Sequence, residues 1–240
     1  MQERYLGDIH DYYKFLFLKN LSNFFQLRIG CNWYLVKPDN IGHSEVKKND
    51  GEKRSYLNKN IDLDTKIIKE FLPLKNFNNR VMKNFIKNTH LRKFIKFYHK
   101  HLDHTNRDQW FQQSIQNLKN CNYVFLDPDN GLISNDSKIS SKKKIKYILT
   151  SELKKMYQKR FNVIFCQFQS FNKKHREMLI LKRNMIMDEI GLKINSHVLR
   201  NRVSPNTYYI SLLQKGYEKK FNDFLIGFSK TNQKVEIIEI

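Results

Sequence analysis

One buried strand that ends abruptly in polar residues constrains the fold of this chain more than any other feature. Residues 123–126 (Tyr-Val-Phe-Leu) form a continuous apolar, β-branched and aromatic run, which predicts a buried strand. Asp-Pro-Asp-Asn-Gly follows directly at 127–131. Proline cannot donate to a sheet and Asn-Gly accepts positive φ, so the strand must end in a turn. In open α/β sheets, the edge beyond such a strand end is where ligands bind.

This turn has two interpretations. Asp, Pro, Asn and Gly are all common turn residues, so the segment could be an ordinary strand-to-loop connection. Carboxylates placed just beyond a buried strand also recur at active sites, where their ionisation can be tuned. On the second interpretation we expect Asp127, Pro128, Asp129 and Asn130 to be the catalytic residues.

The chain carries a large excess of positive charge. Its 240 residues include 44 Lys and Arg against 23 Asp and Glu, a formal net charge of +21. That excess predicts affinity for polyanions, with RNA or DNA as the first partner to consider. Lys, Asn, Ile and Phe are abundant throughout, as in proteins from AT-rich genomes, so part of the excess reflects composition alone.

Cysteine usage and hydropathy indicate a cytoplasmic protein with no membrane partner. The three cysteines, Cys31, Cys121 and Cys166, lie in or beside apolar runs, as small buried hydrophobes do in a reducing compartment. No Cys/His spacing predicts a metal site, and we expect His99, His101 and His104 to lie on a solvated face. The charged N-terminus does not resemble a signal peptide, and no run approaches the length of a membrane span.

Two further segments place polar residues near the same strand ends. The expected helix over 8–26 has Asp8 as a plausible N-cap and brings Asp11 and Lys14 onto one face, either as a solvated pair or at the mouth of the site. The expected strand over 29–36 closes on Pro-Asp-Asn with Asp39, so two such ends could face one cleft. The following loop, 38–60, is either solvated or grips phosphates.

The remaining periodicities predict an alternation of helices and strands within one domain that spans 1–240. A helical, basic insert is expected at about 60–120, and a hairpin is expected over 193–202 and 206–213. Other helices are expected near 64–72, 78–88, 106–118, 151–156, 173–190 and 217–226, and other strands near 94–98, 162–169 and 235–238. The candidate nucleic-acid-binding residues are Arg54, Arg80, Lys83, Arg92, Lys96 and Arg107.

This order of elements resembles the class I S-adenosylmethionine-dependent methyltransferases, whose parallel sheet ends in an antiparallel hairpin. In their amino-methylating branch the fourth strand ends in Asp/Asn-Pro-Pro-aromatic, and Asp127-Pro128 matches its first half. Bacterial ribosomal RNA adenine-N6 methyltransferases also carry a Gly-Asn-x-x-Asp-x-x-Lys helix start. The segment from Gly7 to Lys14 is similar, with Asp8 in place of the Asn. The chain departs from the family in two places. Asp129 and Asn130 replace the second proline and the aromatic residue of the motif, and no Gly-rich turn follows the expected strand at 29–36.

The resemblance implies a Rossmann-like, mostly parallel sheet with flanking helices and a terminal hairpin. It also implies an enzyme that transfers a methyl group from S-adenosylmethionine to a base amine, held by Asp127. Asp39, Asp11 and Lys14 would be cofactor contacts, and the basic insert would hold phosphates.

Two alternatives remain open at this point. Asp127 and Asp129, joined by Asp39 or Glu152, could bind Mg²⁺ in a nuclease or phosphodiesterase, although no Glu-x-Lys companion is present. The missing Gly-rich turn instead favours a non-catalytic, basic nucleic-acid-binding module on a degenerate Rossmann scaffold.

Overall fold

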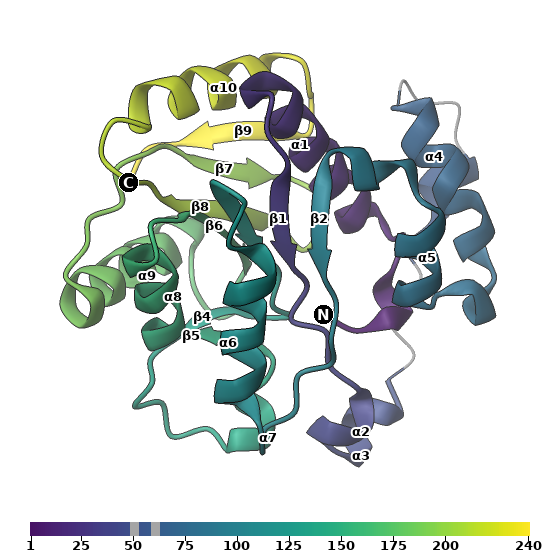
Figure 1. The fold of residues 1–240 in the computed structure, drawn as a ribbon, viewed down its shortest axis with the longest axis horizontal. Coiled ribbons are helices and arrows are strands. Elements are labelled where there is room, and N and C mark those ends of the chain that lie inside the picture. The colour runs from purple at the N-terminus through teal and green to yellow at the C-terminus, as the bar shows by residue number, and fades with distance from the viewer. Residues whose placement is uncertain (49–52, 59–62) are drawn as a thin grey trace.

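The computed structural model describes residues 1–48, 53–58 and 63–240 as an α/β fold around a seven-stranded sheet (Figure 1). The strand order is β2-β1-β3-β6-β8-β7-β9. The first four strands of that order are parallel, and the last three join them through antiparallel pairs. The strands are β1 (Ile29–Asn32), β2 (Ile95–Tyr98), β3 (Tyr123–Leu126), β6 (Asn162–Phe168), β7 (Val198–Asn201), β8 (Thr207–Leu212) and β9 (Val235–Ile238). The predicted mostly parallel sheet with a C-terminal antiparallel hairpin is confirmed.

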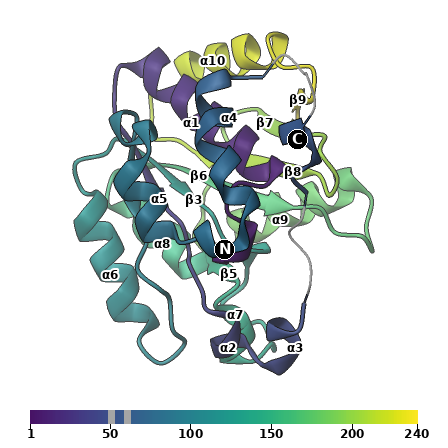
Figure 2. The same cartoon turned by 90° about the vertical axis from the view of Figure 1, so that its right-hand side faces the viewer.

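Helices cover both faces of the sheet, because each buried strand sends alternate side chains to opposite sides. Tyr123 and Phe125 pack with α1 and α10, whereas Val124 and Leu126 pack with α6, α8 and α9. The longer helices are α1 (Ile9–Phe25), α4 (Thr65–Phe71), α5 (Met82–Asn88), α6 (Arg107–Leu118), α8 (Thr150–Gln158), α9 (His175–Ile190) and α10 (Glu218–Lys230). The short helices are α2 (Pro38–Ile41), α3 (His43–Val46) and α7 (Ser141–Lys144), which group together beyond the carboxyl ends of the parallel strands (Figures 1 and 2).

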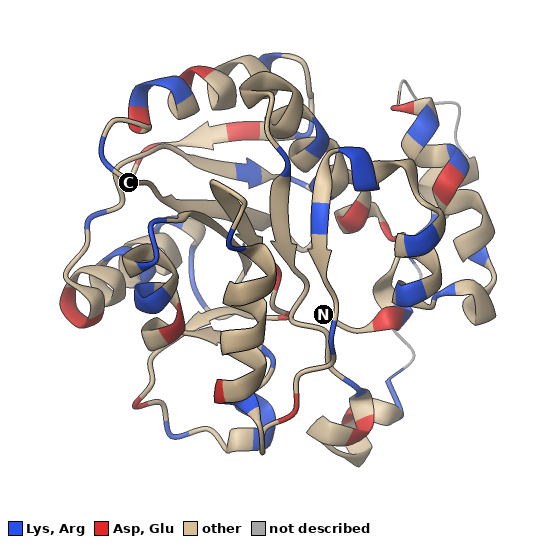
Figure 3. Ribbon diagram, viewed as in Figure 1, with Lys and Arg blue, Asp and Glu red and all other residues tan. Residues whose placement is uncertain are grey.

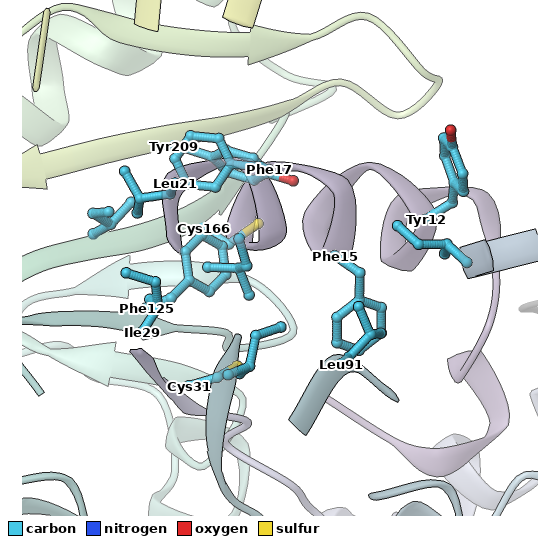
Figure 4. Close-up of a cluster of buried hydrophobic side chains, with 14 of the residues drawn as sticks. Tyr12, Phe15, Phe17, Leu21, Ile29, Cys31, Leu91, Phe125, Cys166 and Tyr209 are labelled. Atoms are coloured by element: carbon cyan, nitrogen blue, oxygen red, sulfur yellow. The ribbon is translucent and has the colours of Figure 1, made fainter. Parts of the chain in front are cut away.

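Aromatic side chains from α1 form the centre of one core layer. Phe17 lies 4.9 Å from Tyr209 and 6.3 Å from Phe125 between ring centroids, and Figure 4 shows these residues gathered under α1 with Cys166. All three cysteines are buried and free, as the sequence predicts. No helix in the described part of the chain combines the length and hydrophobicity needed to cross a bilayer.

Several elements differ from the sequence prediction. The strand predicted over 29–36 pairs only as far as Asn32, because the chain then turns through Tyr34 at positive φ (44°). A second sheet of two short parallel strands, β4 (Gly131–Ile133) and β5 (Tyr147–Leu149), was not predicted. The helix predicted over 151–156 is α8, which begins at Thr150 with Leu149 at the N-cap position. The loop expected over 38–60 contains α2 and α3, and part of it lies outside the described residues.

Candidate functional site at the carboxyl edge of the sheet

A cavity of about 890 Å³ opens beyond the carboxyl ends of β3 and β6. The loop after β3 and the segment from Gln167 to Lys173 line it, and α1 and α9 contribute further lining residues. This is the edge at which open α/β sheets bind ligands, and the volume lies within the roughly 300–1,000 Å³ typical of ligand sites. Of the sequence-predicted catalytic residues, Pro128, Asp129 and Asn130 line this cavity.

The cavity has a basic part and an apolar part. The basic part contains the lysines Lys14, Lys48, Lys53, Lys146, Lys173 and Lys182. The apolar part contains Phe168, Phe171, Met178, Leu181, Met185 and Pro205. A ligand that fits both parts must combine an anionic group with an apolar surface.

A buried ion-pair bridge joins α1 to the end of β3 behind the cavity wall. Lys14 Nζ donates to Asp11 Oδ1 at 2.8 Å and to Asp127 Oδ2 at 2.6 Å, and it lies 4.8 Å from the Trp33 ring centroid. Burial would lower the pKa of Lys14, but Asp11 and Asp127 raise it well above its ordinary value. Burial also raises the pKa of Asp127, with Lys14 opposing this effect. Asp127, which is only 1% exposed, therefore fastens the loop rather than lining the cavity.

Asp129 is the centre of a second cluster that ties the N-terminal segment to the same loop. It pairs with the Met1 amino group at 2.8 Å and accepts a hydrogen bond from Gln2 Nε2 at 2.9 Å. The same Gln2 amide donates to Glu45, which also pairs with Lys146 at 3.1 Å. Burial opposes ionisation of Glu45, but donors from Gln2, Lys48 and Lys146 lower its pKa to about 2. The loop after β3 is thus held by Lys14, by the Met1 amino group and by Lys146, whose Nζ lies 3.8 Å from Asp129.

The backbone of this loop requires glycine at position 131. Gly131 has φ of +103°, and an added Cβ would lie 2.2 Å from Gln167 Oε1. That Oε1 accepts from Leu132 N at 3.0 Å, while Gln167 Nε2 donates to Asn130 O at 3.1 Å. Gln167, a polar residue near the end of a predicted strand, therefore fixes how Asn130 faces the cavity.

Two residues at the start of α1 carry unusual protonation states in the cavity wall. Asp8 caps the helix by accepting from Asp11 N at 2.9 Å, as predicted. Burial and the neighbouring Asp11 carboxylate raise the pKa of Asp8 to about 7. Burial, with Lys53 and Lys14 adding to it, lowers the pKa of His10 to about 3. His10 is therefore neutral at pH 7.

The structure brings together Asp11, Lys14 and the Asp127–Asn130 loop, which the sequence had placed near one another. Asp39 lies elsewhere, exposed on α2 and outside the cavity lining. Lys146 and Tyr147 also line the cavity.

The predicted nucleic-acid-binding residues lie outside the cavity lining, and three of them support the protein backbone. Arg54 donates to Leu6 O at 2.8 Å, and Arg80 donates to Leu74 O at 2.9 Å. Arg107 donates to Tyr147 O at 2.7 Å and also pairs with Glu152 at 2.7 Å.

The other three predicted contacts remain at the surface, where Lys83 and Arg92 are exposed and Lys96 is half-buried on β2. Sequence reasoning did not single out Lys48, Lys53, Lys173 and Lys182, although Lys48 and Lys53 belong to the 38–60 loop for which phosphate binding was one of two expectations. For Lys173 the available signal was its position at the start of the helix predicted over 173–190, shortly after the strand predicted over 162–169.

Metal binding by the two loop carboxylates has little support from their surroundings. Asp127 and Asp129 are already neutralised by Lys14 and by the Met1 amino group, respectively. Across residues 1–48, 53–58 and 63–240, no group of three or more His, Cys, Asp or Glu side chains is arranged to hold a metal ion.

Comparison with known proteins gives no assignment, since no protein-family profile matches the chain. No curated protein matches its sequence either. The function is therefore inferred from the fold and from the residues around the cavity.

Proposed function

We propose that this protein binds nucleic acid, with backbone phosphates held by the lysines that line the cavity at the carboxyl edge of the sheet. The observation that carries the proposal is the charge of that lining, in which six lysines face three aspartates. Figure 3 shows Lys and Arg spread over the whole fold, so net charge alone does not locate a partner. The cavity supports the proposed location, because it concentrates cations in a concave site.

Three of these lysines have no carboxylate partner among the described residues. Lys182 Nζ donates to Leu132 O at 2.6 Å, Lys53 Nζ donates to Ser204 O at 2.5 Å, and Lys173 lies at the start of the α9 wall. Burial lowers the pKa of Lys182, since no nearby anion compensates its charge. A phosphate in the cavity would supply that compensation.

The first prediction concerns the double variant Lys173→Gln/Lys182→Gln. We expect it to bind a fluorescently labelled oligonucleotide about tenfold or more weakly, because two phosphate contacts are lost while glutamine can still donate to Leu132 O. The plot of log K against log salt should also become shallower by about 1–2. Fluorescence anisotropy at several salt concentrations measures both quantities.

The matched control is Lys83→Gln/Arg92→Gln, which removes the same charge from the exposed surface outside the cavity. It should change affinity much less. Equal losses in the two double variants would place binding on the general surface charge, and no binding by the unmodified protein would overturn the proposal.

A second candidate, methyl transfer to a base amine, is favoured by the sheet and by the loop that follows β3. The parallel strands run into an antiparallel hairpin, and Asp127-Pro128 ends a strand beside the cavity. The helix start from Gly7 to Lys14 reaches the same place, because Lys14 contacts Asp127.

The residues at the end of β1 do not fit S-adenosylmethionine, which the resemblance implies as the cofactor. Trp33, Tyr34, Leu35 and Val36 are all buried there. The N-terminal segment closes over them, with the Met1 amino group donating to Tyr34 O at 2.8 Å and Val36 N donating to Met1 O at 2.8 Å. No glycine turn opens the backbone to a nucleotide at this point.

The second prediction follows from the burial of residues 33–36 at the end of β1. Calorimetric titration of the protein with S-adenosylmethionine should give no saturable heat, because the usual crevice is occupied by the chain itself. S-adenosylhomocysteine serves as a second probe of the same crevice. A saturable isotherm with either compound would contradict this prediction and make methyl transfer the leading function.

A further inference from the structure

The apolar part of the cavity indicates which form of nucleic acid fits. We propose that the cleft takes a single strand, with an unpaired base lying against Phe171 and Leu181 while neighbouring phosphates contact Lys173 and Lys182. This inference rests on the proposed function and specifies that the bound nucleic acid is single-stranded.

Two apolar side chains that line the cavity, Phe171 and Leu181, are exposed, whereas Met178 belongs to the core beneath them and Met185 packs against it. Phe171 is 80% exposed in the segment between β6 and α9, and Leu181 on α9 is 46% exposed. Met178, Leu181 and Met185 are spaced three and four apart, so they form one stripe of the helix along the cavity wall. An exposed phenylalanine and an exposed leucine that line one cavity provide apolar surface on which a base can stack.

Cations alternate with these apolar residues along the chain. Lys173 follows Phe171 by two residues, and Lys182 directly follows Leu181. All four residues line the same cavity. This arrangement matches a strand whose bases and phosphates alternate, as in proteins that combine stacking platforms with a basic groove.

A duplex cannot use the apolar wall in this way. Its base faces are stacked inside the helix and only the base edges are accessible in the grooves. A duplex would therefore contact the lysines alone, whereas an unpaired base gains the stacking contribution as well. The expected difference is a preference for single strands at equal salt.

The test uses fluorescence anisotropy with three labelled probes: a single-stranded oligonucleotide, its duplex form, and a single strand of equal length with abasic sites. The full chain should bind the base-bearing single strand at least tenfold more tightly than the duplex. Phe171→Ala should weaken binding of the base-bearing strand by about fivefold to a hundredfold, because one stacking contact is lost. It should leave binding of the abasic strand unchanged.

Phe77→Ala is the matched control, since Phe77 is 62% exposed on the 3-10 segment Phe77–Asn79 and lies outside the cavity lining. It should not affect any probe. If single strand and duplex bind equally, or if Phe171→Ala weakens the abasic strand as much as the base-bearing one, the inference is wrong while nucleic-acid binding stands. If no probe binds, the proposed function itself fails.

Discussion

Replacing Lys14 with methionine is expected to destabilise the fold by about 3–5 kcal/mol, because the change leaves two buried carboxylates without their counter-ion. Lys14 is 3% exposed, and Asp11 and Asp127, its two partners, are each 1% exposed. Methionine retains most of the side-chain volume beside Trp33, so the loss of stability comes from the missing charge and not from lost packing. Urea denaturation at pH 8 measures the free energy of unfolding.

The control is Lys19→Met on the same helix, since Lys19 pairs with Asp64 in a more exposed position. That variant should lose about 1 kcal/mol or less. Adding Asp127→Asn to Lys14→Met should recover part of the loss, because one of the uncompensated charges is removed. Lys14→Met alone should also be less impaired at pH 5 than at pH 8, since burial raises the pKa of Asp127 and protonation removes its uncompensated charge. Equal losses in the Lys14 and Lys19 variants would show that the buried bridge has no special role.

The sequence predicted the elements that depend on local patterns. The continuous apolar run at 123–126 became β3, and Asp8 caps α1 as expected, because both features depend on neighbouring residues alone. The three-residue spacing of Asp11 and Lys14 was sufficient to place them on one face. The contact of Lys14 with Asp127 joins residues 113 positions apart in the chain, so it emerges only from the packing of α1 on the sheet.

The basic residues of the site were harder to predict, because a run of cations in the sequence need not form a cluster in space. Arg80 and Arg107 belong to the most basic segment, yet they satisfy backbone carbonyls and a carboxylate within the fold. Lys53, Lys146 and Lys182 come from three distant segments and meet only at the carboxyl edge of the sheet. The short strands β4 and β5 were missed for a related reason. They span three residues each, too few to show a period.

Replacing Asp8 with asparagine is expected to stabilise the fold above pH 7 and to leave its stability nearly unchanged near pH 4. Burial and the adjacent Asp11 raise the pKa of Asp8 from an ordinary value of 3.8 to about 7. Between these values the unfolded chain has lost the proton that the folded chain keeps, so stability falls as pH rises. Asparagine removes this penalty and still caps α1 by accepting from Asp11 N. The gain should reach the order of 2–4 kcal/mol above pH 7.

Asp64→Asn at the start of α4 separates this effect from helix capping in general. Asp64 also caps its helix, accepting from the backbone N–H groups of Lys66 and Ile67. Burial opposes its ionisation, but Lys19 and those N–H groups lower the pKa of Asp64 below its ordinary value. That carboxylate therefore stabilises the fold above its unfolded pKa, and its replacement should destabilise the protein at pH 7 and have little effect well below pH 4. Thermal unfolding of both variants from about pH 2 to 8 should show opposite trends, with a gain in Asp8→Asn that grows as pH rises and a loss in Asp64→Asn that fades as pH falls below about 4. A common trend would mean that the two caps are equivalent and that the carboxylates of Asp8 and Asp11 do not repel each other in the cavity wall.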